Sequence, residues 1–291
     1  MTSRRDHSGT CNVRSLDSTA GPVDAITLHW PEYLMEGLEL GLFMIVACSA
    51  GTLLFYRGSP VLRYLPSAMS RLVLMGLTMG LTAIAIIRSP FGRRSGAHFN
   101  PAVSITFLCL RKMHWLDTVF YVAAQFAGGT LGVLLAHALI GSRLAAPSVR
   151  YVVTVPGFYG TAAAFAAEFF MGWLMMTVVL ISSNRVALAS FTWLLVGLLV
   201  MLYVIVFSQV SGFSVNPART FSSAIVAHIW TAIWLYFSAP VLGMLAAAGL
   251  YVLWSGSETV YCGKIYHDLH SPCPFRCRFR QLTQTDRKSV V

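Results

Sequence analysis

Two copies of the tripeptide Asn-Pro-Ala are the residues of this sequence whose types and spacing point most clearly to chemistry. Asn100-Pro101-Ala102 lies in "SGAHFNPAVS", and Asn216-Pro217-Ala218 lies in "SGFSVNPART". Proline is accepted at the first position of a helix, and an asparagine before it is a good N-cap. Each tripeptide therefore predicts the start of a helix, with an asparagine amide that could donate a hydrogen bond to a passing oxygen.

The elements that must position these tripeptides are long and apolar. Of the 291 residues, 56% are hydrophobic and 11% are charged, and the mean hydropathy is +0.66. Since roughly 20 apolar residues span a bilayer, we predict an all-α integral membrane protein. Its six expected spans are 33–55, 72–87, 119–140, 162–181, 191–207 and 233–253. The first span carries Glu36 and Glu39, which favours a retained span over a cleaved signal peptide.

The net charge of +10 is distributed as a membrane topology would require. With six spans both termini share one side, where fifteen Lys and Arg residues fall, against five on the other side. This positive-inside bias predicts cytoplasmic tails at 1–29 and 255–291, around a membrane domain at 30–254. The charge therefore reflects topology and not nucleic-acid binding, and we expect the protein in the cell membrane.

The two halves of the membrane domain, about 30–140 and 160–254, repeat the same order of features. Each begins with a span that carries a glutamate in an early turn, Glu36 or Glu168. Each continues through a second span to its tripeptide and closes with a third span. An odd number of crossings inverts the second half relative to the first. The two tripeptides are therefore expected to enter the membrane from opposite faces.

The apolar runs after the tripeptides are too short to cross a membrane. They last to Leu110 and to about Ile225, roughly half a span each. The segments 92–99 and 211–215 before them are predicted to be non-helical, which is tolerated at membrane depth only inside protein or along a wet cavity. Two half-helices meeting at the midplane would point their positive ends at each other and oppose cations. This pattern predicts a narrow pore for small neutral molecules.

The paired motifs resemble those of the aquaporin, or major intrinsic protein, family, and the resemblance extends over about residues 30–255. It implies an hourglass fold of six tilted helices and two half-helices, built as an inverted repeat. It also implies a homotetramer in the lipid bilayer with one pore per subunit. Such a protein is a passive channel rather than an enzyme, and we expect no cofactor and no metal.

The resemblance implies roles for several residues near the motifs. Arg219 would form one side of the pore constriction, donating hydrogen bonds to the permeant and repelling cations. His98 would line the cytoplasmic vestibule. Glu36 and Glu168 would accept hydrogen bonds from the segments that lead into the half-helices, with Gln125 in "YVAAQFAG" as a further match. Proton-relay carboxylates are the alternative reading of the two glutamates.

The resemblance also places a selectivity filter in the pore. Counting from the motifs gives Val204, Phe213 and Arg219, and leaves Gly80 and Met79 as equal alternatives in the second span. Water-selective members usually carry an aromatic residue and a histidine where this chain has Met79 or Gly80 and Val204. An aromatic residue like Phe213 is typical of glycerol facilitators, whereas positions outside the filter match water channels. We predict a water channel that excludes protons and ions; passage of small uncharged solutes is left open, and a glycerol facilitator is the alternative.

Other classes of membrane protein fit the sequence less well. A secondary transporter, the remote alternative, also uses inverted repeats, but Asp117 is the only aspartate between Asp24 and Asp268, so coordinating carboxylates are scarce. An ion channel is opposed by the two positive helix ends and Arg219. An intramembrane enzyme would need a nucleophile–base pair, and the sequence offers no motif for one.

The cysteines form no regular pattern in the sequence. Cys262, Cys273 and Cys277 lie in the expected C-terminal tail, with His267 and His270 nearby. A structural metal site needs four well-spaced ligands, and these spacings are irregular. We therefore expect ordinary reduced thiols in a flexible tail.

Overall fold

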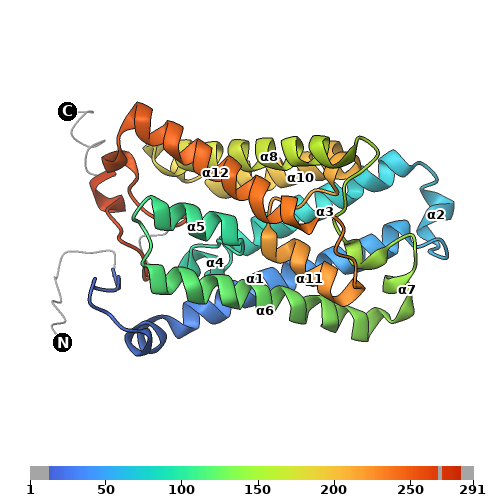
Figure 1. Cartoon of the computed structure of the whole chain (residues 1–291), viewed down its shortest axis with the longest axis horizontal. Helices are drawn as coiled ribbons and strands as arrows, with labels where there is room; N and C mark the ends of the chain where they lie inside the picture. Colours follow the sequence, from blue (N-terminus) through green and yellow to red (C-terminus); the bar gives the residue numbers. More distant parts are fainter. Residues whose placement is uncertain (1–12, 268–270, 283–291) are drawn as a thin grey trace.

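The computed structural model describes residues 13–267 and 271–282, and these fold almost entirely into helices (Figure 1). The long helices are α1 (Pro22–Phe55), α3 (Ala68–Arg88), α6 (Trp115–Ile140), α8 (Gly160–Ser183), α10 (Thr192–Ser211) and α12 (Ile233–Ser255). The shorter ones are α2 (Val61–Tyr64), α4 (Pro90–Ser95), α5 (Pro101–Cys109), α7 (Ser142–Ala145), η1 (Arg150–Val152), α9 (Val186–Ala189), α11 (Pro217–Ala227) and η2 (Ser257–Thr259). A β-bridge joins Val13 to Cys273.

The six long helices are each long and apolar enough to cross a membrane, which confirms the predicted all-α class. The clearest difference from the sequence prediction is at α1, which begins at Pro22 instead of residue 33. Its extra turns contain His29 and Glu32, and because these residues are polar, hydropathy does not predict that the helix includes them. Both are buried and partnered, His29 by Asp117 and Glu32 by Arg94, so they add to the helix rather than ending it.

The long helices approach each other most closely at glycines, which have no side chain to keep the two backbones apart. The most extensive contacts are between α1 and α6, between α8 and α12, and between α3 and α10. A Cβ on Gly128 of α6 would lie 2.0 Å from the carbonyl oxygen of Gly37 on α1. A Cβ on Gly243 of α12 would lie 2.1 Å from the carbonyl oxygen of Phe169 on α8. The two halves of the chain therefore use the same kind of close crossing.

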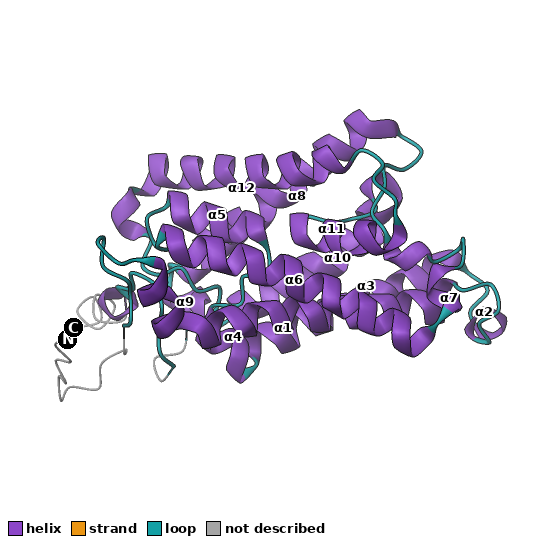
Figure 2. Ribbon diagram, turned by 60° about the horizontal axis from the view of Figure 1, so that its bottom comes forward, coloured by secondary structure: helices purple, strands orange, loops and turns teal. Residues whose placement is uncertain are grey.

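The short helices α5 and α11 lie between the long ones (Figure 2). In Figure 2, α5 is nearer to the end that carries α4 and α9, and α11 is nearer to the end that carries α2 and α7. The prediction of a non-helical 92–99 segment is wrong in its first part, because Pro90–Ser95 form α4. The hydroxyl of Ser89 caps α4 by accepting from the N–H of Gly92.

Candidate functional site: the meeting point of two half-helices

The half-helices begin where the tripeptides predicted. Helix α5 starts at Pro101 and α11 at Pro217, each with the preceding asparagine as N-cap in extended backbone. The side-chain oxygen of Asn100 accepts from the N–H of Ala102, and that of Asn216 accepts from the amides of the next turn. With the oxygens used in this way, both side-chain nitrogens are turned away from their own helices.

Each asparagine nitrogen binds the other half of the protein. Nδ2 of Asn100 donates to the carbonyl oxygen of Val215 at 2.8 Å. Nδ2 of Asn216 donates to the carbonyl oxygen of Phe99 at 2.7 Å. The acceptor is in both cases the residue just before the opposite tripeptide. The positive ends of two half-helices from opposite halves of the chain therefore face each other across this reciprocal pair of bonds.

The segments before the tripeptides are held in strained backbone. The same positions have positive φ in both copies, namely Gly96, Ala97 and Phe99 in the first and Gly212, Phe213 and Val215 in the second. A non-glycine residue in this region costs about 1–3 kcal/mol and persists only when its surroundings over-determine it. Each segment must therefore be held by groups behind it.

Glu168 of α8 holds the second segment. It is buried, and its Oε1 accepts from the N–H of Ser214 at 2.8 Å and from the hydroxyl of Ser211 at 2.7 Å. Its Oε2 accepts from the N–H of Val215 at 2.6 Å. All three bonds fix the backbone just before Asn216.

Glu36 of α1 holds the first segment in the same way. Its two oxygens accept from the N–H groups of His98 at 2.9 Å and Phe99 at 2.6 Å. The amide nitrogen of Gln125 on α6 donates to Oε2 at 2.8 Å and also reaches the hydroxyl of Ser104 at 3.2 Å. Glu36 and Gln125 therefore fix the backbone just before Asn100 and the first turns of α5.

Sequence reasoning missed a second layer of support. The hydroxyl of Tyr121 donates to the carbonyl of Ser95 at 2.7 Å, and that of Tyr236 donates to the carbonyl of Ser211 at 2.6 Å. Glu39 accepts from the hydroxyl of Ser95 at 2.8 Å, so it faces this support and not solvent. The signal was present in the sequence, because both motifs begin with the same Ser-Gly pair.

Arg219, the residue after the second tripeptide, is buried in α11. Its Nη1 has no hydrogen-bond partner among the described residues. A buried guanidinium donor without an acceptor is costly. Arg219 therefore presents a donor that a polar molecule inside the protein could satisfy.

The other predicted filter residues are buried as well. Val204 on α10 and Phe213 are 4% and 9% exposed. Of the two alternatives on α3, Gly80 packs against α10, since a Cβ there would lie 2.7 Å from the carbonyl oxygen of Gly197. Met79 is also buried, one position away from that contact. The helix packing therefore leaves Gly80 no room for a side chain that could line a pore.

His98 is buried under the C-terminal segment. Its Nε2 lies 2.8 Å from the carbonyl oxygen of Gly263, and its ring stacks on Phe275 with centroids 5.2 Å apart. The N–H of Ile265 donates to the carbonyl of Gly96. Residues 260–282, as far as they are described, thus pack directly on the segment before the first tripeptide. We call this segment, 96–99, and its counterpart, 212–215, the first and second re-entrant segments.

The expectation of a flexible tail is therefore wrong for the described part of the tail, which packs on the helix bundle. The expectation of reduced thiols agrees with the structure there, because Cys262, Cys273 and Cys277 form no disulfide. Cys262, His267, Cys273 and Cys277 lie together, with one ligand atom of each within 4.8 Å of all the others. The reason is tertiary, because the chain folds back at the ends of α4 and α5. His270 lies outside the described residues.

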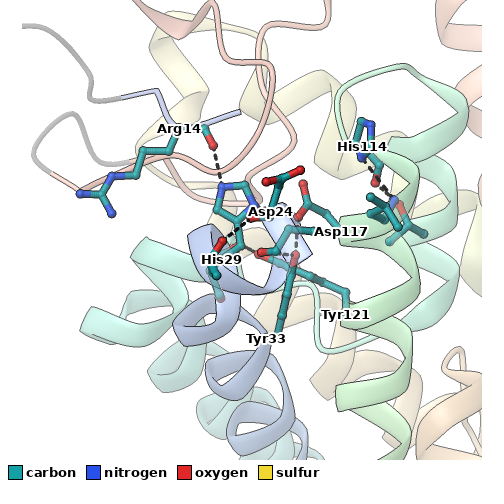
Figure 3. A network of polar contacts seen from close by, with 12 residues as sticks. Arg14, Asp24, His29, Tyr33, His114, Asp117 and Tyr121 are labelled. Atoms are coloured by element: carbon teal, nitrogen blue, oxygen red, sulfur yellow. Dashed lines mark hydrogen bonds and ion pairs between the residues drawn. The ribbon is translucent and has the colours of Figure 1, made fainter. Parts of the chain in front are cut away.

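The N-terminal segment is tied to the same end of the molecule (Figure 3). The N–H of Arg14 donates to the carbonyl of Cys273, and its own carbonyl lies 2.6 Å from Nε2 of His29. His29 and the hydroxyl of Tyr33 both contact Oδ1 of Asp117, at 2.8 and 2.7 Å. Both described ends of the chain therefore meet at one end of the helix bundle.

Comparison with known proteins places this architecture. The chain is similar to aquaporin NIP1-3 of rice (Oryza sativa subsp. japonica), with 35% identity over 184 residues, 61% of this chain and 60% of that protein. It is similar to aquaporin NIP6-1 of Arabidopsis thaliana, with 35% identity over 175 residues, 60% of this chain and 55% of that protein. The chain thus spans about three fifths of the length of the curated relatives it matches.

A solved structure has a similar fold, and a protein-family model matches the sequence. The X-ray structure of the aquaglyceroporin from Plasmodium falciparum superposes with a TM-score of 0.63 at 21% identity, covering 77% of this chain and 95% of that one. The description of the major intrinsic protein family matches residues 27–251. With two half-helices that meet through their asparagines, an inverted repeat and this match over most of its length, the chain belongs to the major intrinsic protein family of membrane channels.

Proposed function

We propose that this channel conducts water through a pore lined at its centre by Asn100 and Asn216. The observation that carries the proposal is the reciprocal pair of bonds between the two motifs. An amide nitrogen has two protons, and one on each asparagine is committed to the opposite carbonyl. The second is then available to a permeant oxygen. A water held by two donors must point its own protons away, which interrupts a proton wire.

Charge supports the exclusion of ions. The N-termini of α5 and α11 carry partial positive charge, and Arg219 adds a full one. The carboxyl groups of Glu36 and Glu168 are engaged by backbone N–H groups behind the re-entrant segments, so they offer a cation little compensation. The free-energy cost of entering such a pore is smallest for a neutral molecule with an oxygen acceptor.

We propose a filter made by Met79, Val204, Phe213 and Arg219. The packing of Gly80 against α10 favours Met79 for the α3 position. Three of these side chains are apolar and one donates hydrogen bonds, a combination suited to a small molecule with both carbon and hydroxyl groups. This composition favours a second candidate function, glycerol facilitation, beside water conduction.

The positions of the basic residues support cytoplasmic tails. Arg93 and Lys112 contact the C-terminal segment through their carbonyls, so they lie at the end where both described termini meet. Arg57, Arg63 and Arg143 lie in or beside α2 and α7, at the other end in Figure 1. This separation fits the positive-inside rule with the tail end in the cytoplasm.

We further propose the homotetramer expected of the resemblance. A groove of about 960 Å³ is lined by residues of α1, α3, α4 and α6 and by none of α5 or α11. Exposed leucines line it, among them Leu34, Leu38 and Leu131. Native mass spectrometry of the detergent-solubilised chain should show four copies, and a stable monomer would contradict this assembly.

Stopped-flow light scattering tests the function. The full chain is reconstituted into vesicles, which are shrunk with an impermeant osmolyte and separately exposed to a glycerol gradient. Because thiols cluster at one end of the pore, both measurements are made with and without a metal chelator and a reductant. Faster osmotic shrinkage than in empty vesicles is expected, and glycerol entry then measures the width of the filter. Shrinkage no faster than in empty vesicles, with or without chelator and reductant, would contradict the channel.

A further inference from the structure

The four side chains at the C-terminal end have the chemistry and the geometry of a metal site. Three cysteine sulfurs and one histidine nitrogen lie within 4.8 Å of one another. The sulfurs of Cys262 and Cys273 are 3.5 Å apart, and Nε2 of His267 is 3.0 Å from the sulfur of Cys277. In a tetrahedral site with zinc–sulfur bonds of about 2.3 Å, two thiolates lie about 3.8 Å apart. The two short pairs would open by a few tenths of an ångström, and the widest separations, at most 4.8 Å, would close by about 1 Å to reach that geometry.

The cluster sits on a rigid base. Cys262 and Cys273 are buried, and the backbone of Cys273 is fixed by Arg14. Next to Cys262, the N–H of Tyr261 donates to the side-chain oxygen of Asn184 at the end of α8. The N–H of Arg276 donates to the carbonyl of Lys112 beyond α5. The ligands are therefore positioned by contacts to the N-terminal segment and to two separate parts of the membrane domain.

A buried lysine supplies the charge that such a site needs. Lys264 is 1% exposed, and its ammonium donates to the carbonyls of Arg93 and Pro272 instead of reaching solvent. A buried ammonium is unfavourable without a nearby negative charge. Three thiolates, a neutral imidazole and a divalent ion together carry one negative charge. Lys264 and the metal-loaded cluster would neutralise each other.

We propose that Cys262, His267, Cys273 and Cys277 bind one Zn²⁺ ion tetrahedrally, and that this ion anchors residues 260–267 and 271–282 over one mouth of the pore. Soft thiolates with a single imidazole select zinc among the abundant divalent ions. The anchoring follows from position, because Gly263 and Phe275 lie between these ligands in the sequence and cover His98. The closed four-ligand set marks a structural site rather than a catalytic one.

Metal content tests the site without reference to transport. The full chain is purified in detergent under reductant, and zinc is measured by inductively coupled plasma mass spectrometry. We expect one zinc ion per chain in the wild type, and at least a severalfold loss in Cys273→Ser and Cys277→Ser. Cys109→Ser is the matched control, since that cysteine is exposed at the end of α5 and is not one of the four clustered ligands, and this variant should keep its zinc.

A second readout guards against variants that fail to fold. The wild-type chain is stripped of metal and titrated with Co²⁺, which should give the thiolate charge-transfer and ligand-field bands of a tetrahedral site at one equivalent. Substoichiometric zinc together with an octahedral cobalt spectrum would overturn the proposal. So would isolation of a metal-free chain with a Cys262–Cys273 disulfide under the same reducing conditions.

Limited proteolysis tests the anchoring, also independently of transport. Trypsin cleavage after the buried Lys264 should be slow in the zinc-loaded chain and at least severalfold faster after chelation. Cleavage after Arg57, which is exposed near α2, should not change and serves as the control. Equal cleavage after Lys264 with and without zinc would show that the ion does not fasten this segment.

Discussion

The amide of Asn100 donates to the carbonyl of Val215, one residue before Asn216, and the amide of Asn216 donates to the carbonyl of Phe99, one residue before Asn100. This exchange joins the two halves of the inverted repeat at the point where their half-helices meet. Each helix end is capped by its own asparagine oxygen and held in register by the other half. The centre of the site is thus a property of the pair and of neither motif alone.

Glu168→Gln should destabilise the second re-entrant segment. The carboxyl accepts from Ser211, Ser214 and Val215, and an amide in its place would turn a donor toward at least one of these donors. Leaving one such buried group unsatisfied costs about 1–3 kcal/mol. Differential scanning fluorimetry in detergent should show a lower unfolding temperature. Glu258→Gln, at an exposed side chain, is the control, and an equal shift in both variants would contradict this role.

Gly128→Ala should disrupt the crossing of α1 and α6. Its Cβ would lie 2.0 Å from the carbonyl oxygen of Gly37, so the helices would have to separate. Gly249→Ala is the matched control, because a Cβ there meets nothing within 4 Å and alanine is the better helix former. The yield of monodisperse protein in size-exclusion chromatography should fall for Gly128→Ala alone. Normal yield and stability of this variant would argue against the close crossing.

Met79→Ala and Gly80→Ala separate the two filter alternatives on α3. Shortening Met79 should widen the pore and raise glycerol flux more than water flux. A methyl group on Gly80 would press on the carbonyl of Gly197 and should lower stability without changing the ratio of the two fluxes. Stopped-flow measurement of both permeabilities gives the ratio. A changed ratio in Gly80→Ala with none in Met79→Ala would reverse the assignment.

Val204→His should narrow the filter and add a polar group opposite the apolar wall. Glycerol, the larger solute, should then lose more permeability than water. The same vesicles report both rates, which removes differences in the amount of inserted protein. Equal losses of the two fluxes would place Val204 outside the filter.

Much of the architecture followed from local patterns. Hydropathy gave the six spans, and the Asn-Pro pairs gave the first turns of α5 and α11 because proline and asparagine act on their immediate neighbours. The start of α1 was missed because His29 and Glu32 are polar, and their partners, Asp117 and Arg94, lie far away in the chain.

Features that depend on tertiary contacts could not be predicted from the sequence. The choice between Met79 and Gly80 could not be made without the position of Gly197 on α10. The clustering of Cys262 with Cys273 depends on how the C-terminal segment folds against the first re-entrant segment. Irregular spacing along the chain argued against a metal site, whereas the folded segment brings the ligands together.

Water and proton flux measured in the same vesicles test the central claim most directly. The full chain is reconstituted with an internal pH dye, and both fluxes are measured with and without a zinc chelator. The account predicts osmotic shrinkage severalfold faster than in empty vesicles, with proton leakage no faster than in empty vesicles. Unaccelerated shrinkage, or proton flux that rises together with water flux, would contradict a pore whose centre is formed by Asn100 and Asn216.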